Sequence, residues 1–349
     1  MKWLLLFIPA GLILAVRHAD PMLVFFVSAV AIIPLAQMMG EATEDLSAHL
    51  GPATGGLLNA SMGTLPDLIL GIFALRHGLV DVVKASITGA IVGNMLLGVG
   101  LAILIGGCHF RNGLKFNPYA SHLYSSLMLL ATIGLVIPAI FGYSTDTDRE
   151  ISLEISVILL ASYLLSLIFS LGRPVSSPDE DVAGQVEIAL LSEMKPPGNL
   201  RSAVGILLGS TLMLAVMSEV LTEALQPAAR MMGFTATFTG IFLLAPIGGA
   251  AELINAVRFG RRNQLDIALA STIGSSIQTA LLAAPVLVFT GYAIGQPMNL
   301  LFGKFQVLAI IIAVVAINNT LRMGTVRWIG GAKLIAIYLM LAVGFYYQP

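Results

Sequence analysis

The chain has 349 residues, of which 57% are hydrophobic and only 11% are charged, against roughly 25% charged in an ordinary soluble domain. Its 18 Lys+Arg and 19 Asp+Glu side chains are too few to cover a soluble protein of this size, and the mean hydropathy is +0.91. These values exclude a soluble enzyme, a nucleic-acid-binding protein and a disordered scaffold. They predict an integral membrane protein whose main partner is lipid, and the single Cys108 excludes a disulfide framework or a cysteine metal cluster.

The apolar segments predict an all-α polytopic membrane protein with about 11 transmembrane helices, because a spanning helix needs about 20 mainly apolar residues. The first segment is short and resembles the apolar part of a signal peptide, but it leads directly into the next span, so we expect it to remain as a helix. The expected spans are 3–16, 22–48, 52–75, 82–106, 119–142, 151–171, 202–225, 235–259, 265–291, 305–321 and 329–347.

The basic residues predict the orientation of these spans. Twelve of the 18 Lys and Arg residues fall at the N-terminus or in the connections that share its side of the membrane. The positive-inside rule therefore predicts a cytoplasmic N-terminus and an external C-terminus, in the inner (plasma) membrane of a bacterium.

An internal repeat relates the two halves of the chain at an offset of 185 residues. Gly63 falls on Gly248 and Asp67 falls on Glu252, and the neighbouring spans align without a gap. Each copy would contain five spans, and an odd number of spans forces the second copy to enter the membrane upside down, so we expect two inverted-topology repeats. The resulting organisation is an extra N-terminal helix at 1–20, a first repeat at 21–171, a cytoplasmic acidic linker at 172–201 and a second repeat at 202–349.

The acidic linker has two interpretations. Its carboxylates can simply solvate a connection that contains a short acidic helix, or they can sense cations in a regulatory role.

Two acidic residues lie inside these apolar segments, each within six residues after a proline. Pro66 precedes Asp67 and is expected to free the carbonyl of Met62, and Pro246 precedes Glu252. Unwound backbone at membrane depth is tolerated only where it is buried in protein or lines a wet cavity. A broken helix with a carboxylate in each repeat therefore predicts a site of hard oxygen ligands near the middle of the membrane.

Hard oxygen ligands suit Ca²⁺, Mg²⁺, Mn²⁺ or Na⁺. The carboxylates of Asp67 and Glu252 balance the charge of one divalent cation. When the cation leaves, two like charges in a low dielectric repel each other, so protons can replace it. This is a physical basis for ion exchange at a shared site, and the alternative is a pair of hydrogen-bonded structural acids.

Polar residues one span later are expected to support the site. Asn94 and Gln278 are the stronger candidates because an amide in lipid needs several partners, whereas Ser275 and Ser276 have the alternative of bonding to the backbone or joining helices. Three glycines in the same spans are expected to let these helices approach the broken ones closely: Gly89, Gly93 and Gly274.

Further acids lie toward the ends of two related spans. Their spacing places Glu41 with Glu44, and Glu219 with Glu223, on single helix faces. We expect Glu41 and Glu219 to belong to an acidic vestibule or proton path on the external side, with a solvated helix end as the alternative for Glu44.

These segments resemble the calcium/proton exchangers, the CAX branch of the calcium/cation antiporter superfamily. The likeness is carried by residues 33–44, 58–63, 218–219, 246–252 and 274–278, and it extends over nearly the whole chain. In that family each repeat carries Gly-Asn-Ala-x-Glu, and the two glutamates exchange Ca²⁺ for protons without a cofactor.

The resemblance implies that Asp67 and Glu252 are the exchanging acids. The chain departs from the family motif where Thr64 and Gly249 replace the two asparagines, and where Leu253 replaces a common histidine. The expected ligand set is Asp67, Glu252, Thr64, Met62, Gly63, Gly248 and Gly249.

The sequence therefore supports a cation/proton antiporter, driven by an ion gradient, that carries Ca²⁺ or a related cation and is not an enzyme. Three alternatives remain at this point: a Na⁺-coupled exchanger of the same superfamily, an intramembrane enzyme that uses Asp67 and Glu252 as an acid pair, and a sensor that has lost transport. The sequence leaves the oligomeric state open.

Overall fold

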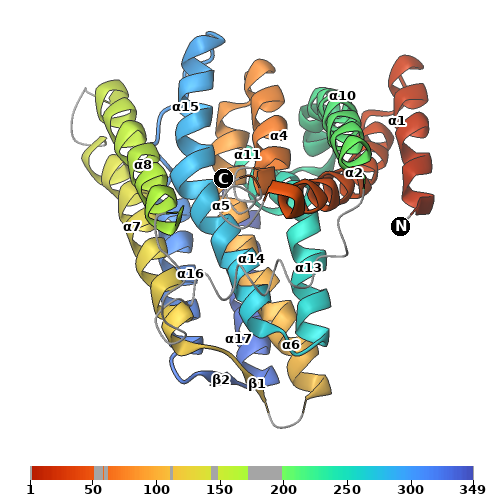
Figure 1. The fold of residues 1–349 in the computed structure, drawn as a ribbon. Helices are drawn as coiled ribbons and strands as arrows, with labels where there is room; N and C mark the ends of the chain where they lie inside the picture. Colours follow the sequence, from red (N-terminus) through yellow and green to blue (C-terminus); the bar gives the residue numbers. More distant parts are fainter. Residues whose placement is uncertain are drawn as a thin grey trace.

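The computed structural model describes residues 2–50, 58, 62–110, 113–142, 148–171 and 199–348, which are almost entirely helical (Figure 1). Its long helices in the first half are α1 (Phe7–Val16), α2 (Pro21–Leu50), α4 (Leu65–Arg76), α5 (Val80–Val92), α6 (Val99–His109), α7 (Pro118–Gly142) and α8 (Asp148–Leu171). Those in the second half are α10 (Leu200–Met232), α13 (Ala250–Arg261), α14 (Leu265–Gln278), α15 (Ala284–Ala293), α16 (Lys304–Thr320) and α17 (Trp328–Tyr346). The shorter elements are the 3₁₀ turn η1 (Lys2–Leu6), the helices α11 (Ala236–Thr239) and α12 (Ala245–Gly248), the π-helical turns η2 (Gly93–Gly98), η3 (Gly240–Leu244) and η4 (Thr279–Ala283), and the strands β1 (Leu114–Lys115) and β2 (Thr325–Val326).

Seven of the described helical stretches are long and apolar enough to cross a membrane, and an eighth is added if the bent pair Ala236–Gly248 and Ala250–Arg261 counts as one span. The chain is therefore an integral membrane protein. Among the eleven expected spans, 3–16 and 305–321 correspond to shorter apolar helices, and 52–75 lies partly outside the described residues. The acidic helix expected in the linker is not among the described residues either, because residues 172–198 lie outside them.

Two continuous helical stretches run through the middle of the molecule, Val80–His109 and Leu265–Ala293 (Figure 1). Each contains a π-helical turn, η2 in the first and η4 in the second. The bounds of α4 and α13 differ by the repeat offset of 185 residues, as do the starts of α5 and α14. Helix α4 leads into the beginning of the first stretch, whereas α13 ends beside α6, so α4 and α13 run toward opposite ends of the molecule.

The helix breaks differ in detail from the expectation that each proline opens the backbone. In the second half the bend of 62° falls at Gly249, three residues after Pro246. Pro246 instead occupies the first turn of α12, directly after η3, where a missing N–H is tolerated. Pro66 likewise lies in the first turn of α4, after the turn at Thr64.

A glycine contact holds the crossing of α5 and η3. A methyl group placed on Gly89 would lie 2.6 Å from the Cα atom of Ile241, and one on Gly240 would collide with Ala85. Helices in lipid have no hydrophobic driving force for association, so close packing must hold them together. Small residues such as these allow the backbones to approach closely enough for that packing. The expectation of close approach is therefore confirmed for Gly89. It is wrong for Gly93 and Gly274, because a methyl group placed on either residue would have no neighbour within 4 Å.

Replacing Gly89 with alanine should destabilise the protein, because the new methyl group meets backbone atoms that cannot rotate away. We expect a loss of about 1–3 kcal/mol, seen as a lower melting temperature of the purified protein in detergent by fluorescence-detected size exclusion. The control is Gly205→Ala, at an exposed helical position with nothing within 4 Å. Equal melting temperatures for the two variants would contradict the importance of this contact.

Candidate functional site: two carboxylates at helix breaks

Asp67 lies in the first turn of α4, immediately after the helix break. The carbonyl of Thr64 accepts a hydrogen bond from the N–H of Leu68 at 3.0 Å, which begins the helix. The Asp67 carboxylate therefore lies at the positive end of the helix dipole. Its Oδ1 atom abuts Gly248 from the other half of the chain, where a methyl group would collide with it. Gly248 thus provides the room that brings Asp67 to the second helix break.

Glu252 occupies the equivalent place in α13. The carbonyl of Gly249 accepts a hydrogen bond from the N–H of Leu253 at 3.1 Å, and Glu252 lies in the first turn that follows. The Glu252 Oε2 atom is buried and, in the part of the chain that the structure describes, has no hydrogen-bond partner. Asp67 Oδ1 lies against Gly248 and Glu252 Oε2 lies beside the neighbouring Gly249, so the fold brings together the two acids that the repeat singled out.

Two amide side chains face the two breaks. Asn94 Nδ2 donates a hydrogen bond to Ser275 Oγ at 3.2 Å, and Asn94 Oδ1 lies 3.4 Å from the position of a methyl group on Gly249. Glu252 Oε2 lies 3.9 Å from that same position. At the first break, Gln278 Oε1 lies 3.6 Å from the position of a methyl group on Gly63.

The two amides thus supply oxygen atoms beside the positions where the family motif has its asparagines. Thr64 adds a buried hydroxyl that has no partner among the described residues. The sequence had named Asn94 and Gln278 only as supporting groups, whereas the structure places one beside each break.

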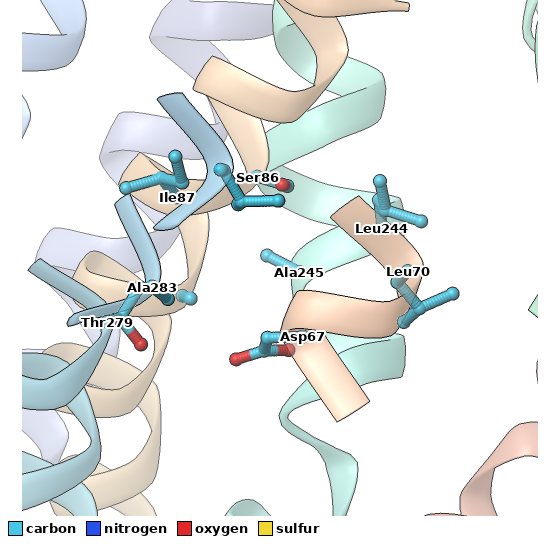
Figure 2. Close-up of a pocket in the computed structure, with 10 residues that line it drawn as sticks. Asp67, Leu70, Ser86, Ile87, Leu244, Ala245, Thr279 and Ala283 are labelled. Carbon is cyan, nitrogen blue, oxygen red and sulfur yellow. The ribbon is translucent and has the colours of Figure 1, made fainter. Parts of the chain in front are cut away.

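A cavity of about 20 Å³ adjoins Asp67, with room for about one water molecule (Figure 2). Figure 2 shows the carboxylate pointing toward the side on which Thr279 and Ala283 lie. The cavity is lined by Asp67, Leu70, Ser86, Ile87, Ala90, Leu244, Ala245, Thr279, Ala283 and Leu287. Its walls are mainly apolar, so an ion here would meet few ligands besides those at the breaks.

The hydroxyl groups near the site are mostly committed to the backbone. Thr279 donates to the carbonyl of Ser275 at 2.9 Å, Ser276 to that of Thr272 at 3.1 Å, and Ser86 to that of Val83 at 2.8 Å. These bonds match the packing alternative for Ser276. The hydroxyl of Ser275 accepts from Asn94 and so fixes the orientation of that amide.

The further acids have different neighbours. Glu44 interacts electrostatically with Arg258, near the end of α13, whereas Glu219 Oε1 lies 3.5 Å from Nε2 of His77, directly after α4. Since α4 and α13 run in opposite directions, Glu44 and Glu219 lie toward opposite ends of the molecule, and the external vestibule or proton path with Glu41 and Glu219 stays a prediction. Glu41 is exposed on α2 and accepts a hydrogen bond from Gln37.

The contact between His77 and Glu219 escaped the sequence reasoning, because nothing in a span-end histidine indicates its partner. It joins α4, which carries Asp67, to α10. In the described part of the chain, no cluster of three or more His, Cys, Asp or Glu residues that could hold a metal is found.

Comparisons with known proteins identify the family to which the chain belongs. The sequence model of the family described as sodium/calcium exchanger protein matches residues 21–172 and 202–347. A Ca(2+)/H(+) antiporter of Synechocystis sp. is 40% identical over 340 residues, covering 93% of this chain and 91% of that protein. The Ca(2+)/H(+) antiporter ChaA of Bacillus subtilis is 35% identical over 347 residues, covering 97% and 96%.

The fold has a close counterpart among solved structures. The structure of native YfkE matches with a TM-score of 0.84 and 31% identity, covering 98% of this chain and 97% of that chain. The H+/Ca2+ exchanger CAX matches with a TM-score of 0.72 at 16% identity, which shows likeness of fold alone. With both halves matched by the family model and full-length relatives above 30% identity, the chain belongs to the sodium/calcium exchanger protein family, in its CAX branch.

Proposed function

We propose that this protein is a Ca²⁺/H⁺ antiporter in which Asp67 and Glu252 bind the cation and protons alternately. The observation that carries the proposal is the meeting of the two helix breaks, each with one carboxylate and one amide oxygen beside it. Two carboxylates neutralise one Ca²⁺ ion, and the amide and backbone oxygens complete a shell of hard ligands. The relatives named Ca(2+)/H(+) antiporter support the same cargo.

The same arrangement explains why the ions would exchange rather than bind together. Without the cation, two anionic carboxylates in a membrane interior repel each other, and the buried Glu252 Oε2 has no hydrogen-bond partner among the residues that the structure describes. Protonation removes this cost, and Ca²⁺ removes it as well. Occupation by one ion therefore excludes the other, which is the requirement for antiport.

The full ligand set of this proposal follows the sequence expectation. Backbone carbonyls of Met62, Gly63, Gly248 and Gly249 and the hydroxyl of Thr64 border the breaks, with Asn94 and Gln278 added. Glu219, linked to α4 by His77, is the acid best placed for a proton path on its side of the membrane.

For the membrane arrangement we propose eleven spans, two inverted five-helix repeats and one extra N-terminal helix. The equal offsets of α4 with α13 and of α5 with α14, and the opposite directions of α4 and α13, support the inverted repeat. We also propose an inner-membrane location with the N-terminus in the cytoplasm, based on the distribution of basic residues.

The rival functions have less support. An acid-pair enzyme needs a substrate pocket, whereas the cavity at Asp67 holds about one water molecule. We therefore propose that the protein is not an enzyme. Na⁺-coupled exchange is tested directly by the experiment below, as is a protein that has lost transport.

Everted vesicles should accumulate ⁴⁵Ca²⁺ when their interior is acidic, because protons that leave the vesicle down their gradient are exchanged for Ca²⁺ ions that enter it. Asp67→Asn and Glu252→Gln should each abolish this uptake, since one carboxylate can no longer exchange its proton. Glu223→Gln is the matched control, because Glu223 is exposed on α10. Uptake driven by a Na⁺ gradient instead of the pH gradient, or uptake unchanged in both site variants, would overturn the proposal.

Removing either amide should weaken Ca²⁺ binding while leaving proton binding possible. Asn94→Ala and Gln278→Ala are each expected to raise the KM for Ca²⁺ by about tenfold or more in the same assay. Ser276→Ala is the control, because its hydroxyl already donates to the backbone. A KM that is unchanged in both amide variants would mean that the two amides are not ligands.

Cys108 tests the orientation, because it is exposed at the end of α6 and is the only cysteine of the sequence. A membrane-impermeant maleimide should label it in everted vesicles and not in right-side-out vesicles. In a Cys108→Ser background, Arg76→Cys at the opposite end should show the reverse pattern. Labelling of Cys108 only from the periplasmic side would contradict the proposed orientation.

A further inference from the structure

A hollow on the surface lies between the end of α6 and the start of α17, far from the helix breaks. Its volume is about 360 Å³, and it is lined by Gly107, Cys108, Arg327 and Trp328. The two helices meet closely here, because a methyl group on Gly107 would lie 2.5 Å from the backbone nitrogen of Trp328. The strand pair of β1 with β2 closes the same end of the molecule (Figure 1).

Four exposed basic residues lie at this end of the molecule, in the two connections and the first half of α17, and one of them, Arg327, lines the hollow. We call them the basic rim: Lys115, Arg322, Arg327 and Lys333. The pairing of Lys115 with Thr325 brings the two connections together, and Arg327 Cγ lies 3.5 Å from the position of a methyl group on Gly113. The stretches 113–118 and 321–333 contain no acidic residue, and the one carboxylate bonded to them in the described part of the chain is that of Asp266, which accepts a hydrogen bond from the N–H of Asn117 at 2.7 Å.

Exposed apolar side chains lie among these charges. Trp328 is 49% exposed, Ile329 47% and Met323 87%. The exposed Leu339 and Met340 follow on α17, so the exposed Lys333 lies between the charged connection and the apolar part of this helix, where a long side chain can extend to the lipid surface. Trp and Lys at such a position are typical of the boundary between lipid tails and headgroups.

From this combination we infer a binding site for the phosphate headgroup of an anionic phospholipid, with the basic rim around the headgroup and Trp328 beside its acyl chains. A small soluble anion would use the charges but not the exposed apolar side chains, whereas a phospholipid uses both. Basic hollows between helices at a membrane surface are suited to such headgroups, and each nearby Lys or Arg contributes measurably to their affinity. The inference is independent of which ion the protein transports.

Tryptophan fluorescence tests the site, because the chain has two tryptophans and Trp3→Phe leaves Trp328 alone. The purified full-length variant is reconstituted into phosphatidylcholine vesicles containing brominated phosphatidylglycerol or, at the same mole fraction, brominated phosphatidylcholine. Bromine quenches nearby tryptophan, so stronger quenching by the anionic lipid reports its preferential binding. We expect that preference in the Trp3→Phe protein, and equal quenching by the two lipids would overturn the inference.

Charge removal identifies the residues responsible. Adding Arg327→Gln to the Trp3→Phe background should lower the preference for phosphatidylglycerol by about fivefold, and Lys333→Gln should act in the same direction if the first variant folds poorly. Arg230→Gln, exposed near the end of α10, should leave it unchanged. An equal loss with Arg230→Gln, or no loss with either rim variant, would contradict the site. Competition by inorganic phosphate alone would show a small-anion site in place of a lipid site.

Discussion

Two carboxylates inside a membrane protein are the constraint on which the rest of this structure depends. A charged side chain near the middle of a bilayer costs roughly 2.5–3.5 kcal/mol even on insertion scales. Each carboxylate is placed in the first turn of a helix, where the dipole favours it, and next to the other half of the chain. In the proposed mechanism the remaining repulsion between the two carboxylates is relieved by protons or by a cation.

Close backbone packing makes that meeting possible. Gly248 lets Asp67 approach the second break, and Gly89 with Gly240 lets α5 cross η3. Every one of these contacts joins the first half of the chain to the second half. The site therefore lies between the two halves, and a methyl group at these positions would separate the groups that must act together.

The departures from the family motif have a structural counterpart. Thr64 and Gly249 lack the amides expected at the breaks, but Asn94 and Gln278 reach the breaks from the two long central helices. The oxygen atoms therefore come from different elements than the motif suggests. The contact of His77 with Glu219 further links the end of α4, the helix that carries Asp67, to α10.

The sequence by itself determined the membrane class, the helical content and the two acids of the site, because apolar length and a repeat offset are properties of the chain order. It also singled out Asn94 and Gln278, since an amide in lipid demands partners. Only the tertiary structure decided which break each amide faces, that the bend falls at Gly249 and not at Pro246, and that Glu44 and Glu219 lie toward opposite ends. These outcomes depend on how the two halves pack against each other, and packing between distant segments leaves no periodic signal along the chain.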